Sequence, residues 1–289
     1  MAKADESEVL KLWQGLGYYS RARNLHFTAK YIVNELHGEF PNTYKGLLKL
    51  KGVGDYTASA IASICFGETT AVVDGNVYRV LSRFYGIETP INTTKGIKEF
   101  KALATELIDQ KQPALFNQAI MELGSQVCKP QTPDCQLCPL SIHCTAFAHQ
   151  QQASFPNLGK KLVQKELNFH YFVLRKGDST WIQKRDKGPW NQLYEFPLIQ
   201  GEHSLESALA ELQKHLLLPT QMHIERSLEC QHLLSHRKIN AHFYTIHSEQ
   251  TFQPSNSTIF EIDFRELFDR YPVSVLIEKY LKLDSSNGK

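Results

Sequence analysis

Four cysteines in one short run constrain this chain more than any other feature of its sequence. Cys128, Cys135, Cys138 and Cys144 follow the pattern C-x6-C-x2-C-x5-C. Four thiolates so close together can surround one metal centre, and both a [4Fe–4S] cluster and a zinc ion take four such ligands. Outer spacings of six and five residues match neither a zinc ribbon nor a zinc finger. At this point a [4Fe–4S] cluster and a zinc site both stay open.

The cysteine run also closes a loop that contains Lys129. One interpretation is that the metal centre presents this basic loop to a phosphate, and the other is that it only staples the chain. Cys65 lies outside the run on an apolar segment, so we expect it in the core. The N-terminus carries no apolar signal core, so the cysteines should stay reduced, which favours metal binding over disulfides. We expect a cytoplasmic protein, associated with the nucleoid if it is bacterial.

Length and charge restrict the function only weakly. A chain of 289 residues is long enough for about two domains. The net charge of +2 and the pI of about 8.1 give little support for a nucleic-acid partner, so a DNA-binding surface must be local. No apolar run approaches 18 residues, and we therefore expect no membrane span.

The pattern of apolar residues changes once along the chain. Residues 7–148 show apolar positions at helical spacing, whereas residues after 168 are rich in aromatic and β-branched runs. Residues 149–167 are polar and contain Pro156 and Gly159, as a linker does. The sequence predicts a mostly helical domain over 1–148, a linker over 149–167, and a smaller α/β domain over 168–285.

Particular segments carry this prediction. Apolar periodicity predicts helices over Phe100–Ile108, Leu115–Leu123 and Ser204–Leu217. Strands are predicted over Phe169–Leu174, Trp181–Lys184 and Ala241–His247.

A Gly-Val-Gly turn separates two short predicted helices, Thr43–Leu50 and Asp55–Cys65. Gly52 and Gly54 permit positive φ and a close approach of the backbone to a ligand, with Val53 between them. The free N–H groups at the start of the second helix can bind a phosphate oxygen. Such a helix-hairpin-helix holds DNA by its backbone and reads no sequence. The alternative is an ordinary turn between helices.

Asp74 precedes another predicted helix, in the segment Val72-Val73-Asp74-Gly75-Asn76-Val77. Aspartate is a preferred N-cap, and that role alone explains its position. The second interpretation is that the carboxylate stabilises a sugar cation during cleavage of a glycosidic bond. One residue can serve both roles.

Several segments together resemble the adenine DNA glycosylases that act at adenine opposite oxidised guanine, the MutY-type enzymes of the helix-hairpin-helix superfamily. They are LWQGLGYYSRARNLH (12–26), LKGVGDYTASAIAS (50–63), VVDGNVYRVLSR (72–83), FNQAIMELGSQVC (116–128) and the cysteine run. The resemblance covers nearly the whole chain. It implies a [4Fe–4S] cluster, a monomer, and duplex DNA with A·oxoguanine or A·G mispairs as the partner.

The resemblance also implies catalytic roles. Asp74 would stabilise the oxocarbenium ion, and Asn76 would help to order the site. Tyr56 stands where lyase-type relatives carry a catalytic lysine. Because tyrosine cannot form a Schiff base, we expect hydrolysis by water without strand cleavage. A thymine-glycol glycosylase with lyase activity is the weaker alternative for the same reason.

Further positions would contact DNA. Tyr18 matches the tyrosine that wedges beside the oxidised guanine, although a core aromatic is the plain alternative. Arg21 and Arg23 would lie near phosphates. The second domain resembles a Nudix fold at KRDKGPWNQLYEFP (184–197) but lacks the acidic metal-binding box, so it should bind without hydrolysing. Within His232–His236, Ser235 and His236 would contact the damaged base, or would belong to an ordinary hairpin turn.

One departure from the family concerns the general acid. The family places a glutamate on an early helix, some forty residues before the GLGYY segment, whereas only residues 1–14 precede Gly15 here. Glu6 and Glu8 do not match that motif. We therefore expect the printed chain to begin after the proton donor, which typically contributes 10²–10⁴-fold. A non-catalytic protein that binds DNA damage is accordingly the alternative function.

Overall fold

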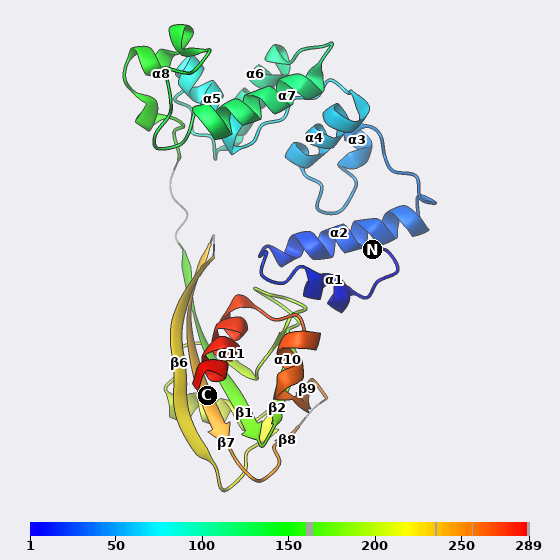
Figure 1. Cartoon of the computed structure of the whole chain (residues 1–289), viewed down its shortest axis with the longest axis vertical. Coiled ribbons are helices and arrows are strands. Elements are labelled where there is room, and N and C mark those ends of the chain that lie inside the picture. Colours follow the sequence, from blue (N-terminus) through cyan, green and yellow to red (C-terminus); the bar gives the residue numbers. More distant parts are fainter. Residues whose placement is uncertain (160–163, 235, 256, 288–289) are drawn as a thin grey trace. The chain divides into compact units, whose positions relative to one another are not determined.

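The computed structural model describes residues 1–159, 164–234, 236–255 and 257–287. Its contacts divide the chain into two compact units. One unit joins Met1–Lys30 to Leu162–Lys289, and the other is Tyr31–Lys161. Helix α2 (Tyr19–Asn34) contains the point of division (Figure 1). None of the described helices is long and apolar enough to cross a membrane.

The unit Tyr31–Lys161 is helical over its described residues, as the sequence predicts. Threonine or aspartate begins three of its helices, because Thr43, Asp74 and Thr93 each accept a hydrogen bond from a first-turn N–H group. The elements are α3 (Tyr44–Leu47), α4 (Asp55–Phe66), α5 (Gly75–Tyr85), α6 (Thr94–Leu107), α7 (Pro113–Glu122), a π-turn (Leu123–Val127), 3₁₀ turns (Ser141–His143 and Gln152–Ser154) and α8 (Thr145–Ala148).

Two apolar clusters hold this unit together. In the larger one, Val77 and Leu81 of α5 pack with Phe100 and Ala104 of α6, and all four are at most 3% exposed. A smaller cluster joins α3 to α4 through Leu47, Leu50, Ala58 and Ala62. The first cluster fixes the helix that Asp74 begins, and the second fixes the two helices around the Gly-Val-Gly turn.

The prediction that Cys65 is a core residue is wrong, because its side chain is exposed. Helix α4 buries Ala58, Ser59, Ala62 and Ser63. Cys65 instead lies in the last turn of α4, after Ser63, the last residue that this helix buries. Phe66 is likewise 43% exposed, so the end of α4 is apolar without being buried.

The other unit contains α1 (Glu6–Leu12) and a mixed sheet. The strand order is β3-β2-β1-β7-β6, with β4 also paired to β1 and β9 to β2. Among the strand pairs of the described residues, β1 and β7 alone are parallel, in register from Lys165–Arg237 to Arg175–His247. The strands are β1 (Lys165–Lys176), β2 (Ser179–Lys184), β3 (Tyr194–Glu195), β4 (Leu198–Gln200), β6 (His223–Leu234), β7 (Arg237–His247) and β9 (Ile259–Asp263).

Helices cover both faces of this sheet, and Figure 1 shows α10 and α11 on one of them. Along β1, Phe169, Tyr171 and Val173 belong to one apolar cluster, and Phe172 and Leu174 belong to the other. This alternation follows from the two-residue period of a strand. The first cluster includes α11 (Val275–Asn287) and α10 (Phe264–Arg270), and the second includes α9 (Leu205–Leu212). The fold is thus a helical domain followed by a Nudix-like α/β domain, as predicted.

Two predicted boundaries differ in this unit. The helix predicted over Ser204–Leu217 ends at Leu212, and Leu216–Leu217 form the short strand β5, which pairs with β8 (Gln253–Pro254). Leu216 is buried in either arrangement, so the apolar pattern alone did not distinguish them. Strand β1 begins at Lys165, inside the segment predicted as a linker.

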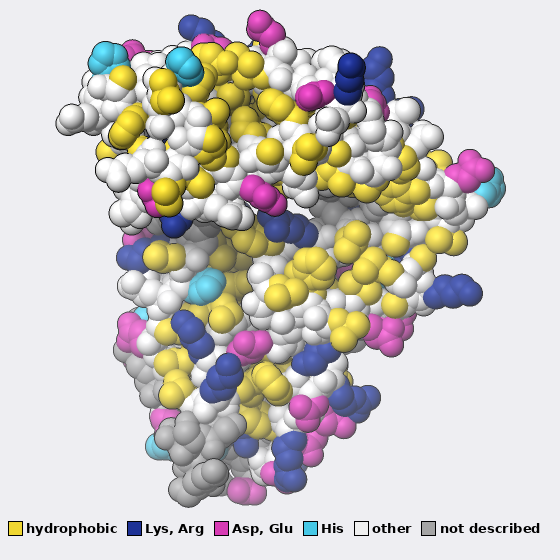
Figure 2. All heavy atoms as spheres, turned by 45° about the horizontal axis from the view of Figure 1, so that its top comes forward, with side chains coloured by type: hydrophobic (Ala, Val, Ile, Leu, Met, Phe, Trp, Pro, Cys, Tyr) yellow, Lys and Arg dark blue, Asp and Glu magenta, His cyan; other side chains and the backbone are white. Residues whose placement is uncertain are grey.

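The face shown in Figure 2 is neither mainly basic nor mainly acidic. Lysine and arginine side chains stand there in small groups among acidic and apolar ones, and apolar side chains gather over the upper part of the picture. Among the described residues of the helical unit, Leu115 is 61% and Tyr85 44% exposed. Net charge was therefore a poor guide to a DNA-binding surface, and the candidate site must be found in local geometry.

Candidate functional site

Asp74 is the N-cap of α5, and its carboxylate is held in one orientation. Oδ1 accepts hydrogen bonds from the backbone N–H groups of Asn76 and Val77, each at 2.9 Å. Oδ2 accepts one from Asn76 Nδ2, also at 2.9 Å. These three donors at the start of the helix fix the direction of the carboxylate. The capping role is therefore confirmed, and the partly exposed carboxylate still has an open side.

Asn76 connects this carboxylate to a buried arginine that the sequence reading missed. Arg79 is 8% exposed, and its Nη2 donates to Asn76 Oδ1 at 2.8 Å and to the Gly124 carbonyl at 2.6 Å. Its Nε donates to the Cys128 carbonyl at 2.7 Å. Burial lowers the pKa of Arg79, and the neighbouring thiol of Cys128 opposes that shift. The segment VVDGNVYRVLSR gave no signal of this burial, because Arg79 lies on the side of the helix opposite Val77 and Leu81.

The second missed residue is Arg83, one turn further along α5. It is 2% exposed, and every nitrogen of its guanidinium donates to the segments around the cysteine run. Nη1 reaches the Lys129 carbonyl at 2.7 Å, and Nη2 reaches the Pro130 carbonyl at 2.8 Å. Nη1 also lies 3.4 Å from Cys128 Sγ. Arg83 therefore fixes the loop that carries Lys129, whose own side chain is exposed.

The four cysteines of the run all line one small cavity, together with Arg83. They are partly buried and unpaired by disulfides. Burial raises the pKa of the Cys138 thiol, and the other three cysteines of the run add to that effect, so the sulfurs stand close together. Gln152 Nε2 also lies 3.7 Å from Cys135 Sγ. The structure thus brings all four predicted ligands to one place.

The spacing of these thiols bears on the kind of metal centre they fit. In the described part of the chain, no three His, Cys, Asp or Glu side chains converge as ligands of a single metal ion do. Zinc requires every sulfur at about 2.3 Å from one point. A cluster contributes its own iron and sulfide atoms and so spans a wider ring of cysteines. Four thiols around a cavity, with N–H donors directed at two of the sulfurs, are a donor set that a thiolate-bound metal centre uses.

The Gly-Val-Gly turn has the backbone that phosphate binding requires. Gly52 has φ +82°, and Gly54 is the N-cap of α4 in extended conformation with no side chain to cap the helix. Gly54 is exposed and Val53 half-buried, so the first N–H groups of α4 face open space. Tyr56, in the first turn of α4, is 46% exposed.

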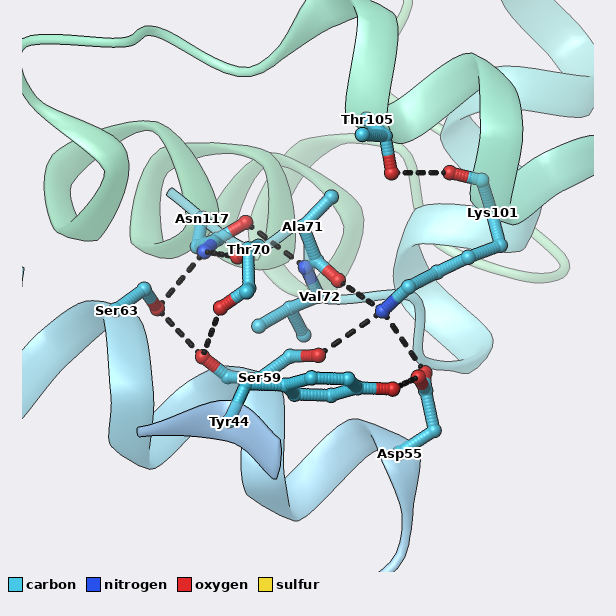
Figure 3. Close-up of polar contacts among 10 residues, drawn as sticks. All are labelled: Tyr44, Asp55, Ser59, Ser63, Thr70, Ala71, Val72, Lys101, Thr105 and Asn117. Carbon is cyan, nitrogen blue, oxygen red and sulfur yellow. Dashed lines mark hydrogen bonds and ion pairs between the residues drawn. The ribbon is translucent and has the colours of Figure 1, made fainter. Parts of the chain in front are cut away.

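A buried polar network connects α4 to α7 and to the segment before Asp74 (Figure 3). Asn117 of α7 is fully buried, donating to Ser63 Oγ and to the Thr70 carbonyl at 2.9 Å, and accepting from Val72 N at 3.0 Å. The sequence reading did not single out Asn117. Its bonds hold the extended segment that leads to Asp74.

The remaining predicted residues belong to the other unit. Tyr18 has φ +47° and is 66% exposed, so it is not a core aromatic, and the Arg21 guanidinium lies 4.7 Å from its ring centre. Arg23 Nη1 donates to the Asn191 carbonyl at 2.7 Å, which gives it a structural contact. His236 is exposed between β6 and β7. Ser235 lies outside the described residues.

Comparisons with known proteins agree with this architecture. Residues 1–106 match the HhH-GPD superfamily of base excision DNA repair proteins, and residues 170–283 match the NUDIX domain. The adenine DNA glycosylase of Mus musculus is 33% identical over 299 residues, which cover 86% of this chain and 58% of the mouse protein. That of Homo sapiens is 48% identical over 153 residues, which cover 53% and 28%.

A bacterial relative is matched over more of its length. The adenine DNA glycosylase of Buchnera aphidicola subsp. Baizongia pistaciae is 32% identical over 259 residues, which cover 87% of this chain and 71% of that protein. Overall, the chain spans about half the length of the curated relatives that it matches. On this identity and coverage, the chain belongs to the adenine DNA glycosylase family.

Proposed function

We propose that this protein removes adenine opposite 8-oxoguanine or guanine from duplex DNA and leaves an abasic site. The observation that carries the proposal is the Asp74 carboxylate, held by three hydrogen bonds at the start of α5 with one side open. Breaking an N-glycosidic bond gives the sugar oxocarbenium character, and a fixed carboxylate stabilises that charge without reorganising. Adenine must first leave the base stack, at a cost of a few kcal/mol.

The reaction proposed is hydrolysis by water. Tyr56 occupies the position where lyase-type relatives carry lysine, and a phenol forms no Schiff base with the sugar. The bond between C1′ and the adenine nitrogen breaks, water adds to C1′, and adenine leaves with a proton. Asn76 keeps Asp74 Oδ2 in place through its 2.9 Å hydrogen bond and so acts as a positioning residue.

Two surfaces of the helical unit would hold the DNA backbone. The uncapped N–H groups after Gly54 would bind one phosphate, with Gly52 and Val53 shaping the turn. The loop of Lys129, fixed by Arg83, would approach a second. Cys128, Cys135, Cys138 and Cys144 would hold a [4Fe–4S] cluster, which cross-links this loop when it is bound. In the other unit, Tyr18, Arg21 and His236, with Ser235, would contact the damaged strand.

A single-turnover assay tests the proposal. Excess protein is incubated with a duplex carrying one A·8-oxoguanine pair, and alkali reveals the abasic site. We expect adenine release by the wild-type chain and a rate about 10²–10³-fold lower for Asp74→Asn. Borohydride should trap no covalent complex, and strand cleavage should require alkali. A trapped complex would instead support a lyase.

The second candidate function is damage binding without catalysis. Among the described residues, the hydrogen-bond partners of the Asp74 side chain are the Asn76 and Val77 amides and the Asn76 side chain, and none of these is an acid that could protonate adenine. Without a proton donor, adenine is a poor leaving group. Tight binding to the A·8-oxoguanine duplex, with no adenine released by excess protein, would favour this candidate over the enzyme.

A further inference from the structure

Lys101 of α6 has an unusually complete set of contacts for a lysine. Its Nζ lies 2.7 Å from the Ala71 carbonyl oxygen, 2.9 Å from Ser59 Oγ and 3.0 Å from Asp55 Oδ2 (Figure 3). An ammonium group has three hydrogens, so each has an acceptor. The side chain is only 28% exposed. Most surface lysines are solvated, whereas the ammonium group of this one is bound to three acceptors.

Its acceptors belong to two different functional segments. Asp55 and Ser59 lie in the first two turns of α4, the helix whose N-terminus follows the Gly-Val-Gly turn. Ala71 lies in the extended segment that ends at Asp74, and it is 1% exposed. A buried carbonyl without a partner costs free energy, so the ammonium stabilises the position of Ala71. Lys101 therefore joins the proposed phosphate site to the segment that places the carboxylate.

A second set of bonds fixes the same segment from α7. Asn117 accepts from Val72 N and donates to the Thr70 carbonyl. Together with the bond from Lys101 to Ala71, three successive residues of the segment are held from two helices (Figure 3). Lys101 additionally donates a hydrogen bond to Asp55, in the first turn of α4.

Charge gives Lys101 a further effect at the hairpin. Asp55 is the first residue of α4, so its carboxylate stands where a DNA phosphate would bind. Aspartate is favourable at a helix start but repels a phosphate. Lys101 neutralises Asp55, and Tyr44 donates its hydroxyl hydrogen to the same carboxylate. The negative charge is thereby turned toward the protein.

We propose that Lys101 is a positioning residue that couples the DNA-gripping hairpin to Asp74. Through Asp55 it keeps the end of α4 receptive to a phosphate, and through Ala71 it sets the segment before the catalytic carboxylate. This inference rests on the proposed glycosidase function. It assigns Lys101 no contact with adenine or with the sugar.

Four variants separate the two effects. Lys101→Met removes the charge, Lys101→Arg retains it, Asp55→Asn removes the repelling partner, and Asp55→Asn with Lys101→Met removes both. Lys98→Met is the matched control, because Lys98 is exposed on the same helix one turn earlier. For each variant, DNA affinity is measured across a salt series, and adenine release is measured at saturating DNA.

Lys101→Met is expected to weaken DNA binding about tenfold and to slow adenine release at saturating DNA about tenfold. The double variant should recover the affinity, since no unpaired carboxylate remains, but not the rate, since Ala71 has still lost its donor. Lys101→Arg should recover affinity and part of the rate. Lys98→Met should match the wild type in release rate.

Two outcomes would overturn the inference. Wild-type release at saturating DNA by Lys101→Met would show that Lys101 does not position Asp74. Full recovery of both affinity and rate in the double variant would reduce Lys101 to a counter-ion of Asp55.

Failure of the proposed function is distinguishable from failure of this inference. If the wild-type chain releases no adenine, amide hydrogen exchange in the free protein decides the question. Faster exchange at Val72, Asn76 and Val77 is expected in both variants that carry Lys101→Met, and not in Lys98→Met. Unchanged exchange there would refute the coupling without reference to catalysis.

Discussion

Arg79 donates from Nε to the backbone carbonyl of Cys128 across 2.7 Å, and so links the first cysteine of the run to the helix that Asp74 begins. The same guanidinium reaches Asn76, which holds Asp74 Oδ2. Two side chains, Arg79 and Asn76, thus connect the cysteine loop to the Asp74 carboxylate. The separate sequence motifs of the chain meet at this point, and the connection makes the loop part of the candidate site.

Replacing Arg79 should damage both stability and catalysis. Arg79→Lys keeps the charge but loses the planar fork that serves Asn76, Gly124 and Cys128 at once. We expect a loss of about 2–4 kcal/mol of unfolding free energy, because buried acceptors lose their donor. Adenine release should slow at least tenfold. Urea denaturation and single-turnover assays measure the two effects, with the exposed Lys95→Met as control. Wild-type values for Arg79→Lys would show that the link is dispensable.

Gly124 should tolerate no side chain. A Cβ there would lie 2.6 Å from Asn76 Cβ and 3.1 Å from Asn76 Cα. Gly124→Ala must therefore push Asn76 away from Asp74, and overpacking of this kind costs about 1–3 kcal/mol. Adenine release should fall more than DNA affinity does. Gly75→Ala is the control for folding, because a Cβ at Gly75 meets nothing within 4 Å. Equal stability of the two variants would contradict the close approach.

Asn117→Leu should destabilise the helical unit strongly. The amide is fully buried and satisfies Ser63, Thr70 and Val72, and leucine leaves all three without that partner. A loss of about 3–5 kcal/mol follows from several unsatisfied buried groups. Thr105→Val, at an exposed hydroxyl on α6, should change stability by no more than about 0.5 kcal/mol. Thermal or urea unfolding tests both, and a marginal effect of Asn117→Leu would discount the network.

Sequence patterns predicted the elements of this fold where local chemistry decides them. Asp74 is an N-cap because its short carboxylate reaches the amides two and three residues ahead, which the sequence alone shows. The Gly-Val-Gly turn and the strands of alternating aromatics are equally local. The four cysteines share one cavity because their spacing allows little else.

The contacts that the sequence did not predict are all tertiary. Arg79 and Arg83 look like surface residues of a helix until the cysteine loop covers them. Cys65 lies among apolar neighbours, yet it stands in the last turn of α4, beyond the residues that this helix buries. The step from α9 to β5 depends on pairing with β8, which lies far along the chain. Burial and strand pairing of this kind depend on tertiary contacts, which the apolar periodicity of a sequence does not reveal.

Tyr44 should titrate abnormally. Its hydrogen bond to Asp55, with a smaller effect of burial, raises the pKa of Tyr44 to about 12. Because this folded pKa lies above the ordinary value of 10, the stabilisation is complete below pH 10 and is lost as pH rises toward 12. The ultraviolet titration curve of the wild type, minus the curve of Tyr44→Phe, should show one phenol that ionises near pH 12. Asp55→Asn should return it toward 10, and a phenol that already titrates near 10 in the wild type would contradict this pair.

The cysteine run makes a prediction that composition analysis alone can test. Protein purified without oxygen should be brown and contain about four iron and four sulfide per chain, as a [4Fe–4S] centre requires. Cys138→Ser should lose most of this iron and weaken DNA binding, since the loop of Lys129 would no longer be cross-linked. Cys65→Ser, at an exposed cysteine outside the run, is the control and should keep the full iron content. Stoichiometric zinc with no sulfide would assign the site to a single ion instead, and full iron content in Cys138→Ser would remove that residue from the ligand set.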